Sequence, residues 1–291
     1  MGSKFDVYAH VTESIIAEIE AGTPPWRKPW TGGASGVALP TRHNGEPYRG
    51  INILMLWIMA TKRGYISSRW MTYKQAQDLG GQVRKGETSS TVVKYGTFTK
   101  ENAQGVEEEL PYARAYRVFN ADQIEGLPEE YYIRPEPPRD LGTTIDSELD
   151  DFFARTGATI LTSEDPRAYY SVTHDHIHMP PVSTFHSATS YFGTLCHEAI
   201  HWTGGPKRLD RIKKFASRDE VALEEVVAEV GSCIVCAQIG IAPEFEQSAA
   251  YVESWLSAIK QDKRAIFRAA SEAQKAADYI LASAQRVDAA A

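Results

Sequence analysis

The sequence S-A-T-S-Y-F-G-T-L-C-H-E-A-I-H-W-T-G-G, residues 187–205, sets the expectations for the rest of the chain. Within it His197, Glu198 and His201 form the pattern H-E-x-x-H. Positions i and i+4 lie one turn apart on the same face of an α-helix, so the two imidazoles can bind one metal ion. Glu198 can reach a water bound to that ion and act as its general base. The pattern therefore predicts a helix that supplies half of a metal site.

An amphipathic helix with two surface histidines gives the same pattern, so a third ligand has to decide between the two interpretations. Residues 219–238 predict a second long helix, in which Glu224, Glu225 and Glu229 interrupt an apolar run. Three carboxylates are costly to bury without a cation or polar partners. A glutamate ligand on a following helix, with a second carboxylate one turn later that orients a ligand histidine, is the arrangement of thermolysin-like gluzincins. We therefore expect one divalent cation, Zn²⁺, with the ligands His197, His201 and Glu225. Glu229 is the expected orienting carboxylate, or an alternative ligand.

The composition is that of a globular protein. The 291 residues are 43% hydrophobic and 24% charged, and they are enough for two domains of ordinary size. The longest apolar stretch, residues 53–60, is too short to span a bilayer, and the N-terminus has no signal-peptide core. An odd number of cysteines (Cys196, Cys233 and Cys236) suggests reduced thiols, so we expect a cytoplasmic protein with structural cysteines.

The charge is distributed unevenly along the chain. The net charge is −7, yet residues 21–100 contain twelve Lys or Arg and only three acidic residues, a local charge of +9. The remainder therefore carries −16. A basic segment in an acidic protein is typical of a protein with a polyanionic partner.

The first part of the chain predicts an α+β domain with a small antiparallel sheet. Residues 5–20 have helical apolar spacing, and residues 47–60 suggest a turn followed by a buried helix. A short helix is expected to begin within residues 69–76. Residues 91–99 and 111–120 alternate as two strands of a hairpin.

The loop T-P-P-W-R-K-P-W, residues 23–30, places Trp26 and Trp30 on either side of two cations. Indoles can stack on unpaired bases while neighbouring cations contact phosphates. For each Trp, packing in the core of its own domain is an equally good interpretation. The residues that we expect to contact nucleic acid are Trp26, Arg27, Lys28, Trp30, Arg49, Trp70, Tyr73, Lys74, Arg84 and Lys85.

A proline-rich segment without periodicity divides the chain. It predicts a first domain over residues 1–130, a linker over 131–145 and a second, helix-rich domain over 146–291. After the linker we expect a helix at 146–157, strands at 158–162, 168–172 and 175–179, and helical structure over 247–288. The histidines His174, His176 and His178 suggest a second metal site or, as we prefer, an edge strand beside the active cleft.

The chain resembles the ArdC-type antirestriction proteins of conjugative plasmids over nearly its whole length. In the first domain the resemblance depends on P-W-R-K-P-W, Y-R-G-I-N, W-M-T-Y-K-Q-A, G-G-Q-V-R-K-G-E and Y-R-V-F-N-A-D-Q-I-E-G-L-P. These motifs are similar to a single-stranded-DNA-binding module that also begins TraC-type primases. In the second domain D-H-I-H-M-P-P, C-H-E-A-I-H-W-T-G and L-E-E-V-V-A-E-V-G resemble a zincin-like metallopeptidase domain.

The resemblance implies a protein that binds single-stranded DNA and helps an incoming plasmid to escape restriction. Its metallopeptidase domain would act on a protein substrate or on the restriction machinery. An alternative is a DNA-binding protection protein whose metal is structural. A nuclease is a third reading that we favour less, because metal-dependent nucleases usually use several carboxylates and two cations.

Overall fold

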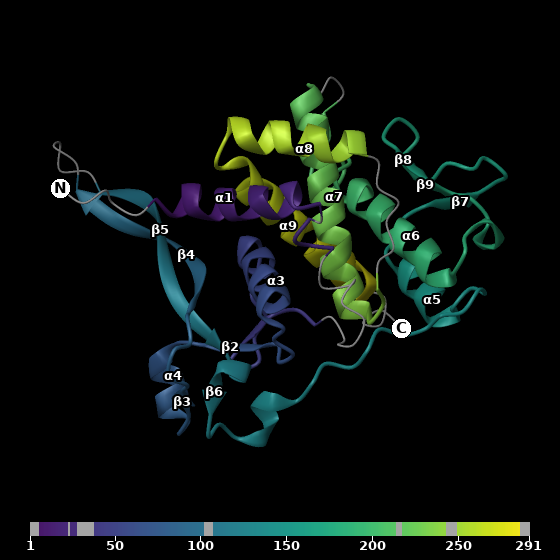
Figure 1. The fold of residues 1–291 in the computed structure, drawn as a ribbon. Coiled ribbons are helices and arrows are strands. Elements are labelled where there is room, and N and C mark those ends of the chain that lie inside the picture. Colours follow the sequence, from purple (N-terminus) through teal and green to yellow (C-terminus); the bar gives the residue numbers. More distant parts are fainter. Residues whose placement is uncertain are drawn as a thin grey trace.

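The computed structural model describes residues 6–22, 24–27, 38–101, 107–213, 217–242 and 249–285. It is a mixed α and β structure, and this confirms the α+β class (Figure 1). No helix within these residues is long and apolar enough to cross a membrane.

The N-terminal half combines helices with a small sheet in the strand order β1-β2-β5-β4. The sheet is antiparallel except for the pairing of β1 with β2. The helices are α1 (Val7–Glu20), α3 (Ile51–Arg63) and α4 (Tyr73–Asp78). The strands are β1 (Thr41–Arg42), β2 (Arg69–Met71), β4 (Ser90–Glu101) and β5 (Glu107–Asn120). A two-stranded sheet and two short 3-10 helices follow, as β3 (Gln82–Val83), η1 (Ala121–Gln123), β6 (Ile124–Glu125) and η2 (Glu129–Tyr132).

The local sequence explains where these elements begin. Asp6 accepts hydrogen bonds from the first backbone N–H groups of α1. Thr72 and Gln75 form a reciprocal capping box, so α4 begins after Thr72 and residues 69–71 form a strand instead of the expected helix. The predicted hairpin is confirmed, and β4 and β5 pair without interruption from Ser90–Val118 to Glu101–Glu107.

The C-terminal half consists mainly of helices, as the sequence predicted. It contains α5 (Ser147–Arg155), β7 (Ile160–Thr162), β8 (Tyr169–Ser171), β9 (His176–Met179), η3 (Val182–Thr184), α6 (Ala188–Thr203), α7 (Arg218–Ile239), α8 (Ala249–Gln261) and α9 (Ala265–Gln285). The expected helical region at 247–288 is thus two helices. The side chain of Asp262 accepts a hydrogen bond from the Arg264 backbone at the turn between them.

The histidine-containing strand is not at an edge, and this corrects the sequence interpretation. In the order β7-β9-β8, strand β9 pairs with β7 in parallel and with β8 in antiparallel fashion. Strands β7 and β8 therefore form the two edges. His178 is buried between the Ser163 hydroxyl and the Arg167 carbonyl, each 2.7 Å away, so its ring has structural partners.

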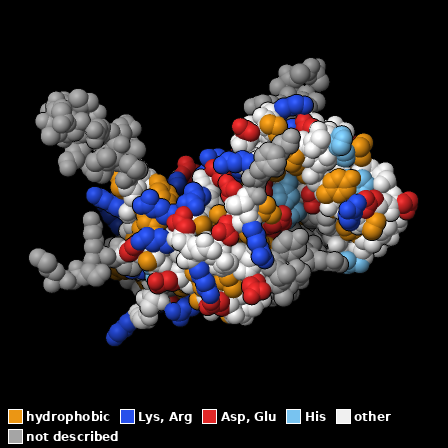
Figure 2. Space-filling model, turned by 90° about the horizontal axis from the view of Figure 1, so that it is seen from above, with side chains coloured by type: hydrophobic (Ala, Val, Ile, Leu, Met, Phe, Trp, Pro, Cys, Tyr) orange, Lys and Arg blue, Asp and Glu red, His pale blue; other side chains and the backbone are white. Residues whose placement is uncertain are grey.

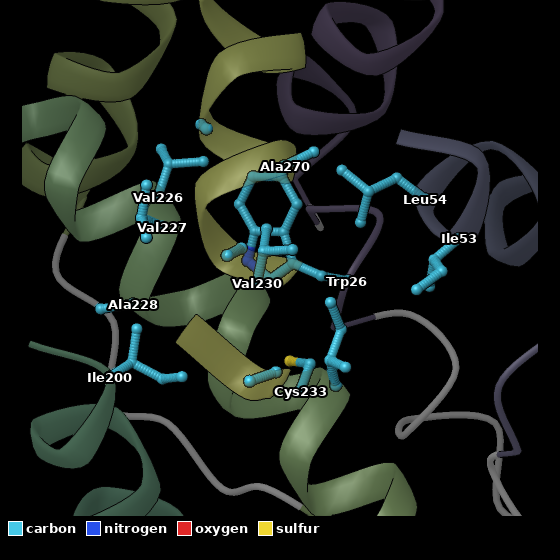
Figure 3. Close-up of a cluster of buried hydrophobic side chains, with 14 of the residues drawn as sticks. Trp26, Ile53, Leu54, Ile200, Val226, Val227, Ala228, Val230, Cys233 and Ala270 are labelled. Carbon is cyan, nitrogen blue, oxygen red and sulfur yellow. The ribbon is translucent and has the colours of Figure 1, made fainter. Parts of the chain in front are cut away.

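The two halves share one hydrophobic core. A single cluster of buried residues runs from α1 and α3 into α6, α7, α8 and α9. Trp26 lies within it, 0% exposed, beside Leu54, Val226, Val230 and Ala270 (Figure 3). Its ring lies 5.8 Å from that of Trp255. The expected division into residues 1–130, 131–145 and 146–291 stays a prediction about the sequence, because the core itself is continuous across it.

We expect Trp26→Ala to destabilise the whole chain. A buried aromatic side chain lost from a packed core costs about 3–5 kcal/mol of unfolding free energy. Urea denaturation would measure this loss. Tyr73→Ala, which removes an aromatic ring that is 44% exposed, is the control and should cost about 0.5 kcal/mol. Equal stability of Trp26→Ala and the unchanged protein would contradict the shared core.

Candidate functional site

Helix α6 presents the two histidines as the pattern predicts. Ser187 caps its first turn through the backbone N–H of Ser190. His197 and His201 then lie one turn apart, and their Nε2 atoms are 3.2 Å from each other. The two nitrogens therefore face a common point.

Helix α7 brings a carboxylate to the same point. Gly231 makes this possible, because a Cβ at that position would lie 2.8 Å from the Ile200 side chain of α6. With the helices this close, the Glu225 carboxylate lies 3.5 Å from His197 and 3.6 Å from His201. One ligand atom from each of these three residues lies within 4.8 Å of the others, and no second such group occurs in the described part of the chain.

The carboxylate that orients a histidine is Glu224. Its Oε1 atom lies 3.2 Å from Nδ1 of His201, on the side of the ring away from Glu225. Arg211 donates two hydrogen bonds of 2.9 Å to Glu224 and also bonds the Ile200 carbonyl at the end of α6. Glu224 is therefore fixed by a cation as well as by the histidine.

Glu229 does not take the place that the sequence interpretation gave it. Arg27 binds its two oxygens at 2.7 and 3.0 Å, and the Trp26 indole donates to it at 3.3 Å. Glu229 thus anchors the loop around residues 24–27 to α7. The interpretation failed because i+4 spacing places a side chain on a helix face but does not tell which partner meets it there.

The protonation of the cluster shows how strongly it attracts positive charge. Burial by itself lowers the pKa of His201, but hydrogen bonds to Glu224 and Glu225 raise that pKa to about 10. Burial raises the pKa of Glu225, whereas hydrogen bonds to His197 and His201 hold it well below its usual range. The two carboxylates therefore favour a positive charge at this point of the cluster.

Glu198 lies beside the cluster in an open cleft of about 800 Å³. Its side chain is buried, and it lines the cleft together with the two histidines and Glu225. Tyr169 and Tyr170 of the edge strand β8 form part of the cleft wall. Two imidazoles and one carboxylate leave a coordination position open, as in catalytic rather than structural zinc sites.

The cysteines do not contribute to this site. Cys196, Cys233 and Cys236 are all buried and form no disulfide. Burial raises the pKa of the Cys236 thiol well above its ordinary value, which disfavours the reactive thiolate. Their burial therefore agrees with the expectation that these three cysteines are structural.

The residues expected to bind DNA lie in different environments. Trp26 and Trp70 are 0% and 1% exposed, so neither indole can stack on a base in this structure. The Arg27 guanidinium is engaged by Glu229. Lys28 and Trp30 lie outside the described residues. The exposed members of the set are Arg49, Tyr73, Lys74, Arg84 and Lys85.

The comparisons with known proteins agree with both halves of the chain. Residues 5–119 match the N-terminal domain of anti-restriction factor ArdC, and residues 147–272 match a zincin-like metallopeptidase. The uncharacterized protein y4eC of Sinorhizobium fredii (strain NBRC 101917 / NGR234) is 38% identical over 98% of this chain and 94% of its own length. A DNA primase TraC of Escherichia coli is 38% identical over 96% of this chain, which spans only 27% of that primase.

Solved structures extend the similarity to three dimensions. The metal-free crystal structure of the antirestriction ArdC protein from the R388 plasmid is 59% identical, with a TM-score of 0.89 over 97% of this chain and 99% of that one. Its Mn(II)-bound structure is 58% identical, with a TM-score of 0.85 over the same shares of both chains. Sequence identity and fold thus agree over the whole chain, which belongs to the ArdC family of antirestriction proteins.

Proposed function

We propose that this protein binds single-stranded DNA and carries one divalent metal centre with metallopeptidase chemistry, and that it acts in the bacterial cytoplasm to protect incoming plasmid DNA from restriction. The observation that supports the enzymatic part is the convergence of His197, His201 and Glu225 beside Glu198 in an open cleft. The DNA-binding part is supported by the basic N-terminal segment and by the similarity to TraC primases.

The three residues fit a divalent cation. Two imidazole nitrogens and one carboxylate are the ligands of mononuclear hydrolytic zinc sites, so we infer Zn²⁺. The Mn(II)-bound relative indicates that such a fold accepts other divalent ions. A bound cation would polarise a substrate carbonyl and lower the pKa of a water molecule. Glu198 would accept the proton of that water, and Glu224 with Arg211 would hold the ring of His201 in place.

Metal affinity should separate ligands from neighbours. We expect Glu225→Gln to weaken Zn²⁺ binding by at least about 100-fold and Glu224→Gln by about 10–100-fold, since one removes a ligand charge and the other an orienting partner. Competition with a chromophoric chelator would measure both. Glu229→Gln is the matched control on the same helix and should change the affinity by less than about threefold. A larger loss in that control than in Glu225→Gln would identify Glu229 as the ligand.

Glu198→Gln should abolish cleavage of peptides while leaving metal bound, because it removes the proton acceptor and no ligand. Mass spectrometry of a peptide library and metal analysis of the purified variant would test this. Cleavage by the variant at the rate of the unchanged protein would exclude the general-base role.

A protection protein without proteolysis is the second candidate. The Tyr170 hydroxyl on the cleft wall is already bonded to Asp175 and Arg208, at 3.0 and 2.8 Å, and so is not available to stabilise an oxyanion. The Glu198→Gln variant distinguishes the candidates in cells, because it would still protect DNA from restriction only if proteolysis is dispensable. Shortening of labelled single-stranded DNA in the presence of divalent metal would instead indicate a nuclease.

Binding to single-stranded DNA should depend strongly on salt. Each phosphate that a cation neutralises lowers the slope of log affinity against log salt by about 0.7, so four contacts give a slope of about −3. Fluorescence anisotropy with a labelled single strand and the matching duplex would show this. Binding that does not change with salt, or tighter binding to the duplex, would contradict the proposal.

A further inference from the structure

A second large cavity, of about 1150 Å³, lies next to the metal cleft along α9, and Arg268 and Ser271 line both cavities. Its walls come from both halves of the chain, namely from the β4–β5 hairpin, the start of α3 and the first turns of α9. We call it the interdomain groove. Gln274 of α9 accepts a hydrogen bond from the Gly50 backbone at 3.0 Å, which holds two of these walls together.

The charged side chains that line the interdomain groove are all cationic, although several of them pair with carboxylates outside the lining. Six cationic side chains line it, and none of the described lining residues is Asp or Glu. These cations are Arg42, Arg49, Lys94, Arg264, Arg268 and Lys275. In Figure 2, Lys and Arg side chains gather around exposed hydrophobic side chains on the left-hand part of the face shown.

The metal cleft has the opposite charge. Its lining includes six acidic residues, against only three Lys or Arg. The acidic residues are Glu198, Glu220, Glu224, Glu225, Glu229 and Glu272. A polyanion is therefore repelled from the metal cleft and attracted to the interdomain groove.

The cations of the groove are available to a phosphate backbone. Lys94 and Arg264 have no ion-pair partner among the described residues, and the Arg264 guanidinium lies over the Tyr8 ring at 5.0 Å. Others, such as Lys275 with Glu272, form solvent-exposed pairs. Such surface pairs are weak, so phosphates can displace the carboxylates.

Aromatic rings in the groove complement these cations. Tyr95 of β4 and Tyr116 of β5 line it and remain 48% and 40% exposed, although large aromatic side chains are usually buried. Exposed rings beside cations are the combination that binds unpaired bases without regard to sequence, since every base has a face on which to stack. A duplex keeps its bases stacked inside and cannot use these rings.

We propose that the interdomain groove is the binding path of single-stranded DNA, with Arg264 and Lys275 of the C-terminal half contributing as much as the N-terminal sheet. This inference rests on the proposed function, because it names the site of DNA binding. It differs from the expectation from sequence, which placed most contacts around Trp26, Trp70 and the turn at Arg84 and Lys85. Of that expected set, the described lining of the groove includes only Arg49.

Matched double variants of the full-length protein test the groove. Arg264→Gln with Lys275→Gln removes two exposed cations of the groove, and Arg134→Gln with Lys207→Gln removes two exposed cations elsewhere. Arg268 is left unchanged because it also lines the metal cleft. Anisotropy with a labelled oligo(dT) strand at several salt concentrations gives the affinity and its salt slope.

The groove pair should bind the strand about tenfold more weakly and lose about 1.4 from the magnitude of the salt slope. The control pair should stay within about twofold of the unchanged protein. Thermal unfolding of both pairs verifies that each is folded. If the control pair loses as much affinity for the strand as the groove pair, or more, the groove is not the binding path. The proposed DNA binding itself would still stand.

A second comparison does not depend on charge. Tyr116→Ala should weaken binding about tenfold with an unchanged salt slope, because it removes a stacking ring and no cation. Tyr73→Ala tests the rival site: it removes a ring of α4 that is 44% exposed and that the sequence interpretation expected to contact DNA, and it should have little effect if the bases lie in the groove. The reverse order of the two tyrosine variants would place the bases on α4 and overturn the groove. If the unchanged protein does not bind the strand at all, both the proposed DNA binding and the assignment of the groove as its site are wrong.

Discussion

The close packing of α6 on α7 is the constraint on which the functional half depends. A helix pair can approach this far only where one side lacks a side chain, and Gly231 against Ile200 is that place. The approach lets one carboxylate meet two imidazoles and lets its sequence neighbour, Glu224, meet the far side of His201. Any larger residue at position 231 would separate the ligands as well as the helices, so the metal site and the helix packing are one structural feature.

The contact between Trp26, Arg27 and Glu229 links that feature to the N-terminal half. The Trp26 indole donates a hydrogen bond to Glu229, and Arg27 forms an ion pair with both oxygens of the same carboxylate. These contacts attach the loop at residues 24–27 to the turn of α7 that follows Glu225. Both interactions are largely removed from water, so losing one partner leaves the other buried without compensation. The loop therefore stabilises the helix that carries the third candidate ligand, although it lies 200 residues away in the sequence.

The two cavities that α9 helps to line differ in charge in a way that suits two different partners. Acidic side chains surround the metal cleft, where a bound cation would offset them, whereas the lining of the interdomain groove is basic. The same helix contributes to both cavities. A protein built in this way can hold a polyanion on one side and a cation on the other without either entering the wrong site, because each cavity repels the charge that the other attracts.

The sequence by itself determined the helices around His197 and Glu225, the hairpin of β4 and β5, and the two histidines on one helix face, because these depend on local periodicity and spacing. It predicted carboxylates within the apolar run of α7, but it gave Glu229 the orienting role that Glu224 takes in the structure. Only the tertiary structure decided which carboxylate meets His201, that Trp26 and Trp70 are core residues, and that cations from α9 join those of the N-terminal half. The physical reason is that spacing determines on which face of an element a side chain lies, whereas its partner there comes from a distant part of the chain.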